Sequence, residues 1–205
     1  FINTCAGTLA ASADSRKKIR QAARQGTARI VTTGCYATIA PEELSALPGV
    51  EWNFSNFEKD EIIQRVLGGG AECEALAPRE ALPGKQHRTR AFIKVQDGCD
   101  NFCTFCLTRL ARGASRSQSR SEIFTDIQAA LEGGVKEIVL TGVNLGAWGR
   151  DLESAPSLPL LINEILHEFA PPRLRLSSLE PWDLSEDFLE VLGLPGFCRH
   201  LHLPL

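Results

Sequence analysis

The sequence alternates short apolar runs with amphipathic stretches from its first residues onward. In the first third of the chain, the apolar runs predict strands at residues 1–5, 29–33 and 50–54. The amphipathic stretches between them predict helices at residues 12–25, from Pro41 onward and at 58–67. Strands and helices of this length, in this order, indicate a small parallel α/β domain.

A second alternating series follows a stretch rich in Gly and Pro. It predicts strands at residues 91–96, 136–141, 173–178 and 200–205. It predicts helices at residues 121–132 with Ser121 as N-cap, 158–169 and 185–192. This order builds either the first half of an eight-stranded βα barrel or a doubly wound sheet, and periodicity does not separate the two. We therefore expect a first α/β domain over 1–70, a linker over 71–88 and a second domain over 89–205.

Composition narrows the class of protein. The hydrophobic share of 43% and the charged share of 23% are ordinary for a globular chain, and no run approaches the ~20 apolar residues of a membrane span. The 205 residues contain no Met, so we expect an internal piece of a longer chain.

The charge is unevenly distributed along the chain. The net charge is −3, yet residues 85–120 carry eight Lys and Arg side chains against two Asp. This basic stretch is either a solvated loop face or an anion site.

Three cysteines provide the strongest chemical signal. Cys99, Cys103 and Cys106 have the spacing C-x₃-C-x₂-C in the loop after a predicted strand, where α/β folds place reactive groups. Three thiolates on one loop can bind three corners of a 4Fe-4S cluster and leave the fourth iron open. The alternative is a structural zinc site, which usually needs four ligands, and no fourth Cys or His lies nearby.

This loop resembles the signature of radical S-adenosylmethionine (SAM) enzymes. In that family the open iron binds SAM, and one electron cleaves it to a 5′-deoxyadenosyl radical. Phe105 matches the aromatic position that approaches the adenine of SAM.

Further segments are similar to the methylthiotransferase branch of that family. They are residues 96–99, 111–113, 141–146, 177–181 and 200–205, and in the first domain residues 1–5 and 33–37. The loop over 146–152 favours the sub-branch that methylthiolates C2 of threonylcarbamoyladenosine at tRNA position 37. The alternatives are the same chemistry on isopentenyladenosine in tRNA or on an aspartate of a ribosomal protein. An alternative of another class is a non-catalytic metal-binding module.

The remaining cysteines divide into two groups. Cys5 and Cys35 each follow a predicted parallel strand, so their loops are expected side by side; alone, both positions are also typical of small buried residues. The resemblance implies that they are the second and third ligands of a second 4Fe-4S cluster, which handles the transferred sulfur. The first ligand is expected upstream. Cys73 and Cys198 match no ligand of the family and are expected to be incidental.

The resemblance also assigns binding residues, although it assigns no catalytic side chain. The residues expected to contact SAM or substrate are Phe105, Thr141, Gly142, Asn144, Ser178 and Glu180. Those expected to contact tRNA phosphate are Arg109, Arg112, Arg116 and Arg120. His200 and His202 alternate on one strand and are expected in a polar interior or in packing rather than on a metal. Residues 107–110 depart from the family, because Arg109 stands where relatives carry proline.

The implied partners follow from the chemistry. They are SAM, a tRNA substrate and an electron donor such as flavodoxin or ferredoxin. We expect the protein in the cytoplasm and expect no membrane partner. Because the expected first ligand and the rest of the barrel are not in the sequence, we expect this piece alone to be inactive.

Overall fold

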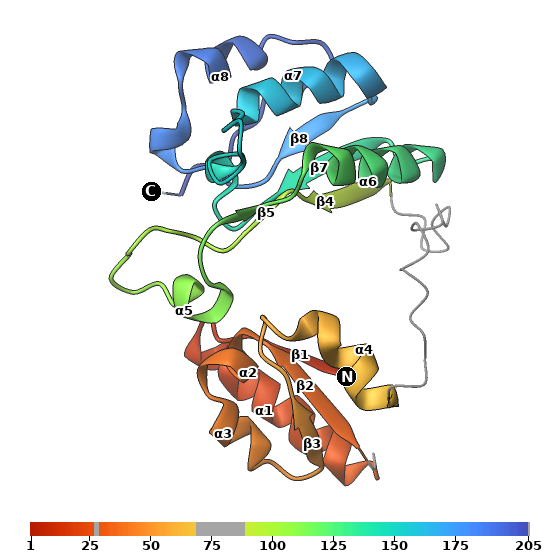
Figure 1. Ribbon diagram of the computed structural model, residues 1–205, viewed down its shortest axis with the longest axis vertical. Helices are drawn as coiled ribbons and strands as arrows, with labels where there is room; N and C mark the ends of the chain where they lie inside the picture. The colour runs from red at the N-terminus through yellow and green to blue at the C-terminus, as the bar shows by residue number, and fades with distance from the viewer. Residues whose placement is uncertain (27–28, 69–88, 205) are drawn as a thin grey trace. The chain divides into compact units, whose positions relative to one another are not determined.

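The computed structural model describes residues 1–26, 29–68 and 89–204, which fall into two compact units (Figure 1). The first unit contains the described residues of 1–68 together with residues 100–114, and the second contains residues 89–99 and 115–204. The linker expected over 71–88 lies outside the described residues, as does Cys73. The domain limits stay a prediction, but residues 100–114 group with the first unit.

The sheet of the first unit has three parallel strands in the order β1-β2-β3. These strands are β1 (Ile2–Thr4), β2 (Ile30–Gly34) and β3 (Val50–Asn53). In the register of the first pair, Thr4 lies opposite Gly34. Every residue of the central strand β2 is buried, as expected for a strand of a parallel sheet.

The first unit also contains helices and one 3₁₀ turn. They are α1 (Leu9–Arg24), α2 (Cys35–Ile39), α3 (Pro41–Ser45), the 3₁₀ turn η1 (Lys59–Glu61), α4 (Ile62–Leu67) and α5 (Thr108–Arg112). Helix α1 begins before the predicted residue 12 because the Thr8 hydroxyl accepts a hydrogen bond from Ala11 N at 3.1 Å and caps it. Ile19 of α1 packs with Ile30 and Leu44 in the core.

The sheet of the second unit is also parallel, in the order β4-β7-β8. Its strands are β4 (Arg90–Lys94), β7 (Glu137–Thr141) and β8 (Leu174–Leu176). The predicted fourth strand over 200–205 is not formed as an element in its described part, residues 200–204; the chain makes one isolated parallel bridge there, between Ser178 and His202. The α/β class with parallel sheets is confirmed, and neighbouring strands follow in chain order, as a βα barrel requires.

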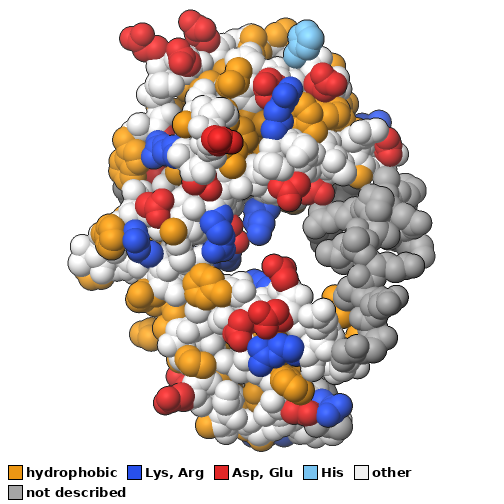
Figure 2. All heavy atoms as spheres, viewed as in Figure 1, with side chains coloured by type: hydrophobic (Ala, Val, Ile, Leu, Met, Phe, Trp, Pro, Cys, Tyr) orange, Lys and Arg blue, Asp and Glu red, His pale blue; other side chains and the backbone are white. Residues whose placement is uncertain are grey.

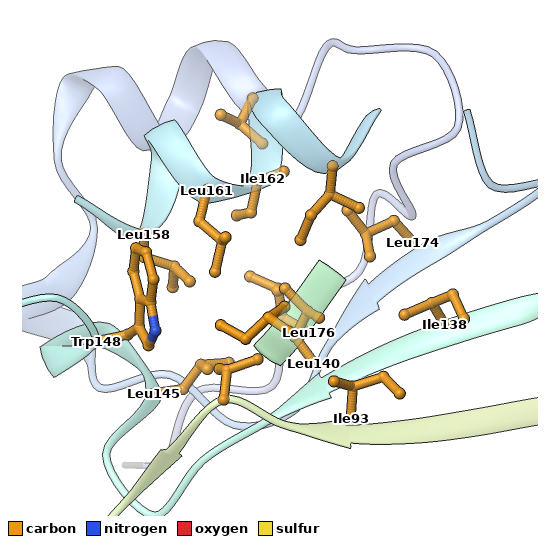
Figure 3. Packing of buried hydrophobic residues seen from close by; sticks show 14 of the residues in the cluster. Ile93, Ile138, Leu140, Leu145, Trp148, Leu158, Leu161, Ile162, Leu174 and Leu176 are labelled. Carbon is orange, nitrogen blue, oxygen red and sulfur yellow. The ribbon is translucent and has the colours of Figure 1, made fainter. Parts of the chain in front are cut away.

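Three helices pack on the sheet of the second unit. They are α6 (Arg120–Glu132), α7 (Leu158–Phe169) and α8 (Glu186–Val191). Figure 3 shows Leu161 and Ile162 of α7 pointing toward Leu140 and Leu176 of the strands. Ser119 rather than the predicted Ser121 caps α6, because Ser119 and Glu122 form a reciprocal capping box.

A short antiparallel ladder interrupts the parallel order. The strand predicted over 91–96 ends at Lys94, and β5 (Gln96–Asp97) then pairs with β6 (Arg116–Ser117). The two ends of the cysteine-bearing segment therefore lie side by side in the second unit. This ladder closes the base of the loop over residues 98–115, which is called the cysteine loop below.

Candidate functional site

Hydrogen bonds define the sulfur environment of the cysteine loop. The loop begins at Gly98, whose φ of 73° lies in the left-handed region that favours glycine. Further along, Cys106 N donates to the Cys103 carbonyl at 3.1 Å, which forms a turn. Thr108 N donates to Cys106 Sγ at 3.4 Å, and Thr108 Oγ1 lies 3.0 Å from the same sulfur.

The donor set of the loop fits an iron–sulfur group. None of Cys99, Cys103 and Cys106 is in a disulfide; Cys99 is half-buried and the other two are exposed. Soft thiolates are the ligands of iron–sulfur clusters, and hydrogen bonds to their sulfurs tune such clusters. Among the described residues, no three His, Cys, Asp or Glu side chains are already grouped as ligands of one ion. The assignment of the three cysteines stays a prediction.

The loop also presents aromatic side chains to solvent. Phe105 is 98% exposed and Phe102 is 83% exposed. The Arg109 guanidinium lies 4.0 Å from the centre of the Phe102 ring and donates to the Asp100 carbonyl at 3.0 Å. Arg109, the residue that departs from the family, thus braces the loop from within α5. Exposed Phe105 is available to stack on a planar ligand.

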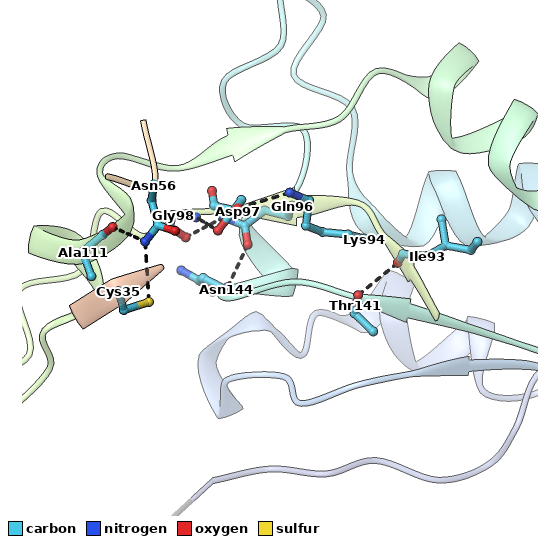
Figure 4. Close-up of polar contacts among 10 residues, drawn as sticks. All are labelled: Cys35, Asn56, Ile93, Lys94, Gln96, Asp97, Gly98, Ala111, Thr141 and Asn144. Carbon is cyan, nitrogen blue, oxygen red and sulfur yellow. Dashed lines mark hydrogen bonds and ion pairs between the residues drawn. The ribbon is translucent and has the colours of Figure 1, made fainter. Parts of the chain in front are cut away.

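A buried amide anchors the base of the loop (Figure 4). Gln96 Nε2 donates to the Gly98 carbonyl at 2.8 Å, and Gln96 Oε1 accepts from Asn144 N at 2.8 Å. Asn144 Nδ2 in turn lies 3.8 Å from Cys99 Sγ. Sequence reasoning assigned no role to Gln96, because the strand run before it already contains the charged Lys94 and nothing local distinguishes the glutamine.

The other residues expected to contact SAM or substrate lie at the ends of β7 and β8. Thr141 Oγ1 donates to the Ile93 carbonyl at 3.2 Å, so its hydroxyl is engaged between strands. Ser178 Oγ lies 2.7 Å from His202 Nδ1, which gives this histidine a polar partner. Glu180 directly precedes the 3₁₀ turn η3 (Pro181–Asp183) as its N-cap residue. Their contacts with a ligand stay a prediction.

Cys5 and Cys35 follow two paired strands. Each comes directly after a residue of the matched pair Thr4 and Gly34, so the prediction that their loops are neighbours is confirmed. Gly7 N donates to Cys5 Sγ at 3.4 Å, and Asn56 Nδ2 donates to Cys35 Sγ at 3.6 Å. Sequence reasoning missed Asn56, because nothing in the pattern of its loop distinguishes it.

One pocket of the first unit collects several of these residues. Its volume is ≈ 530 Å³, and its lining includes Cys35, Cys103, Phe105, Cys106 and Arg112. The cysteine that begins α2 and two cysteines of the radical-SAM-like loop therefore face the same space. The same Asn56 nitrogen that contacts Cys35 also donates to the Ala111 carbonyl at 2.6 Å, which ties α5 to the wall of this pocket.

The arginines expected to contact tRNA phosphate also make contacts within the protein. Arg120 pairs with Glu164 at 2.9 Å and lies over the Phe124 ring. Arg116 is in the short ladder and Arg112 lines the pocket. On the face in Figure 2, basic and acidic side chains are interspersed on each unit. Contact with tRNA phosphate stays a prediction for all four arginines.

The loop that favoured one sub-branch has a structural role. Trp148 is buried, and its Nε1 donates to the Gln118 carbonyl at 3.1 Å. The Asp151 carboxylate accepts from Ser117 N at 2.8 Å. Burial raises the pKa of Asp151, but the hydrogen bonds from Ser117 outweigh burial and leave the pKa below its ordinary value. These contacts fasten the loop to β6.

Known tRNA-modifying enzymes match the chain. It is 34% identical over 217 residues to threonylcarbamoyladenosine tRNA methylthiotransferase MtaB of Bacillus subtilis, covering 100% of this chain and 48% of the relative. It is 36% identical over 213 residues to MtaB of Thermotoga maritima, covering 99% and 48%. It is 28% identical over 229 residues to the tRNA-2-methylthio-N(6)-dimethylallyladenosine synthase of Aquifex aeolicus, covering 100% and 50%. No family model matches the chain.

These matches define the class that the chain resembles: over its whole length it is similar to tRNA methylthiotransferases. The resemblance to the threonylcarbamoyladenosine branch that the motifs indicate is confirmed by the names of the MtaB relatives. The chain spans about half the length of the curated relatives it matches. None of the helices in the described parts of the chain is long and apolar enough to cross a membrane.

Proposed function

We propose that the protein transfers a methylthio group to C2 of threonylcarbamoyladenosine in tRNA, using SAM and two 4Fe-4S clusters. The observation that carries the proposal is the pocket of the first unit, where Cys35 of α2 and Cys103 and Cys106 of the cysteine loop line one space. Methylthio transfer requires a sulfur-handling group and a radical-generating group to act on one substrate. A pocket lined by cysteines of both kinds is suited to that chemistry.

The residues of this chain have distinct parts in the proposal. Cys99, Cys103 and Cys106 would hold one cluster, while Cys5 and Cys35 would supply two ligands of the second. When bound, these groups supply one-electron chemistry at an unactivated C–H bond, which acid–base side chains do not supply. Phe105 would stack on the adenine of SAM. The side chains of Asn144, Ser178 and Glu180, with the turn at Gly142, would orient its polar groups.

The proposal also includes tRNA contacts, an electron donor and a cellular compartment. Arg109, Arg112, Arg116 and Arg120 would contact phosphates beside the modified nucleoside. A small electron-transfer protein, such as a flavodoxin or ferredoxin, would reduce the cluster on the cysteine loop. We place the reaction in the cytoplasm, where tRNA is modified.

The proposal is tested with the full-length protein, reconstituted anaerobically with iron and sulfide. Purified tRNA that carries threonylcarbamoyladenosine is incubated with SAM and reductant, digested to nucleosides and analysed by mass spectrometry. We expect the mass gain of a methylthio group on that nucleoside. A gain only on tRNA carrying isopentenyladenosine, or only on a ribosomal protein, would reassign the substrate. Bound zinc that persists after reconstitution would support the non-catalytic module instead.

A further inference from the structure

Gln96 connects three segments of the second unit through one side chain. It is 1% exposed. Its Nε2 donates to the carbonyls of Asp97 and Gly98 at 2.9 and 2.8 Å and to Ser115 Oγ at 2.9 Å. Its Oε1 accepts from Asn144 N at 2.8 Å. One amide thus contacts both ends of the cysteine loop and the loop that follows β7.

The orientation of this amide is determined by its surroundings. Two of the groups facing Nε2 are carbonyl oxygens, which only accept hydrogen bonds, and the group facing Oε1 is a backbone N–H, which only donates. A flipped amide would therefore oppose acceptor to acceptor and donor to donor. The tight fit is also visible at Gly142, where an added Cβ would lie 3.0 Å from Gln96 Oε1.

Hydrogen bonds connect Gln96 through Asn144 to the sulfur of Cys99. Asn144 is 6% exposed, and the bond from its backbone N–H to Gln96 fixes the start of the turn η2 (Leu145–Ala147). Its Nδ2 lies 3.8 Å from Cys99 Sγ, while its Oδ1 is buried without a hydrogen-bond partner. Gln96 also holds the Gly98 carbonyl, next to Cys99 in the chain. The sulfur and its amide donor are thus both positioned by the same side chain.

We propose that Gln96 is a positioning residue for the cysteine loop: it fixes the Asn144 amide against Cys99 Sγ and thereby stabilises the iron–sulfur group that this loop binds. The inference rests on the proposed function, because it takes Cys99 as a ligand of that group. The hydrogen bonds of the Gln96 side chain go to Asp97, Gly98, Ser115 and Asn144 and not to Cys99 Sγ. Its effect passes through Asn144 and through the backbone at Gly98.

Packing alone does not account for a glutamine here. A buried amide is costly unless its polar atoms are paired, and a leucine or methionine could fill a similar volume next to apolar Val95. Residues that orient metal ligands from behind typically contribute 10- to 100-fold to metal affinity. Gln96 is placed to orient Cys99 in this way, through Asn144 and the Gly98 carbonyl.

The test measures iron release from the full-length protein in a Cys5→Ala/Cys35→Ala background, so that only the cysteine loop contributes. Gln96→Met removes every hydrogen bond of the amide at similar volume, whereas Gln96→Glu keeps the acceptor for Asn144 N and loses the donors. Gln118→Met, beside β6, is the matched control. We expect both Gln96 variants to release iron to a chelator roughly 10- to 100-fold faster than the background protein, and the control to match it. Their electron paramagnetic resonance spectra should also lose the change that SAM produces in the background protein.

A double-mutant cycle separates positioning from general destabilisation. Asn144→Ala removes the donor to Cys99 and leaves the Asn144 backbone N–H in place. If Gln96 acts through Asn144, the double variant should release iron hardly faster than the more affected single variant. Additive effects, or unchanged release in folded Gln96→Glu, would overturn the inference and leave the proposed function standing. If Gln96→Met fails to fold, Gln96→Glu and Asn144→Ala decide the question. A background protein that binds no iron on the loop would overturn the proposed function itself.

Discussion

The Asn56 side chain donates from Nδ2 to Cys35 Sγ at 3.6 Å, and the same nitrogen donates to the Ala111 carbonyl at 2.6 Å (Figure 4). One amide therefore restrains both the cysteine that begins α2 and the end of α5. The Thr38 hydroxyl accepts from Asn56 N at 2.9 Å and fixes the position of this residue. The pocket of the first unit depends on this arrangement, because α2 and α5 both line it.

We predict that Asn56→Ala loosens this wall of the pocket. The loss of hydrogen bonds worth about 1 kcal/mol should raise the alkylation rate of Cys35 by roughly fivefold. The rate is followed by mass spectrometry after brief exposure of the metal-free protein to a maleimide. Asn163→Ala on α7 is the control, because its amide bonds only within its helix. An unchanged rate at Cys35 would show that Asn56 does not restrain it.

Two cysteine variants test the ligand assignment of the cysteine loop. Cys103→Ala should abolish the iron bound by the loop, because it removes one of three thiolates, whereas Cys198→Ala should retain it. Iron and sulfide are measured after anaerobic reconstitution in the Cys5→Ala/Cys35→Ala background. Retention of iron in Cys103→Ala would assign the metal to other residues.

The Glu137 carboxylate should make stability depend on pH. Burial raises the pKa of Glu137, but the hydrogen bond and charge of Arg175, with Arg90, outweigh burial and leave it below its ordinary value. A carboxyl with a lowered folded pKa stabilises the fold above its unfolded pKa of about 4.3 and loses this contribution as pH falls through the folded value.

Glu137→Gln is therefore expected to lower the free energy of unfolding by about 1.5–3 kcal/mol at pH 7. The difference from wild type should shrink below about pH 4.3. Urea unfolding at several pH values measures both quantities. Glu153→Gln serves as an exposed control, and a difference that is constant with pH would contradict the assignment.

Gly34 permits the close approach of β1 and β2 in front of Cys35. Its φ is 102°, and an added Cβ would lie 2.3 Å from the Thr4 carbonyl oxygen. At Gly26, with φ 79°, nothing lies within 4 Å of the added atom. Gly26→Ala should therefore cost only the left-handed backbone penalty of about 1–2 kcal/mol.

Gly34→Ala should cost clearly more, roughly 3 kcal/mol, because the strands must also separate. Thermal unfolding of the two variants gives the comparison. Equal losses of stability would contradict this, because they would mean that β1 and β2 separate at Thr4 with little loss of free energy.

Long regular elements could be predicted from the sequence because their signals are local. Helix α7 has the predicted bounds, since Ser157 caps it, Pro159 stands in its first turn and its apolar residues recur with helical spacing. The cap of α6 was misplaced by two residues, because Ser119 and Ser121 differ only in which one has Glu122 three positions later.

Short elements and side-chain networks depend on partners far along the chain. Helices α2 and α5 have only five residues each, too few to be stable without tertiary contacts, and they were not predicted. The division of the strand over 91–96 arises because Gln96 pairs with Ser117, more than twenty positions later. The cysteines could be found from their spacing. The amides of Gln96 and Asn56 could not, because their hydrogen-bond partners Asn144, Cys35 and Ala111 lie far away in the sequence.

The Gln96 amide also constrains how this region can change during evolution. Its donors and acceptor are matched to Ser115 and to the backbone at Gly98 and Asn144, and Gly142 leaves the room that its oxygen needs. A mutation at one of these positions disturbs the others at once. Among related sequences, positions 96, 115 and 142 should therefore be inherited as a set, and a change at one should accompany changes at the other two.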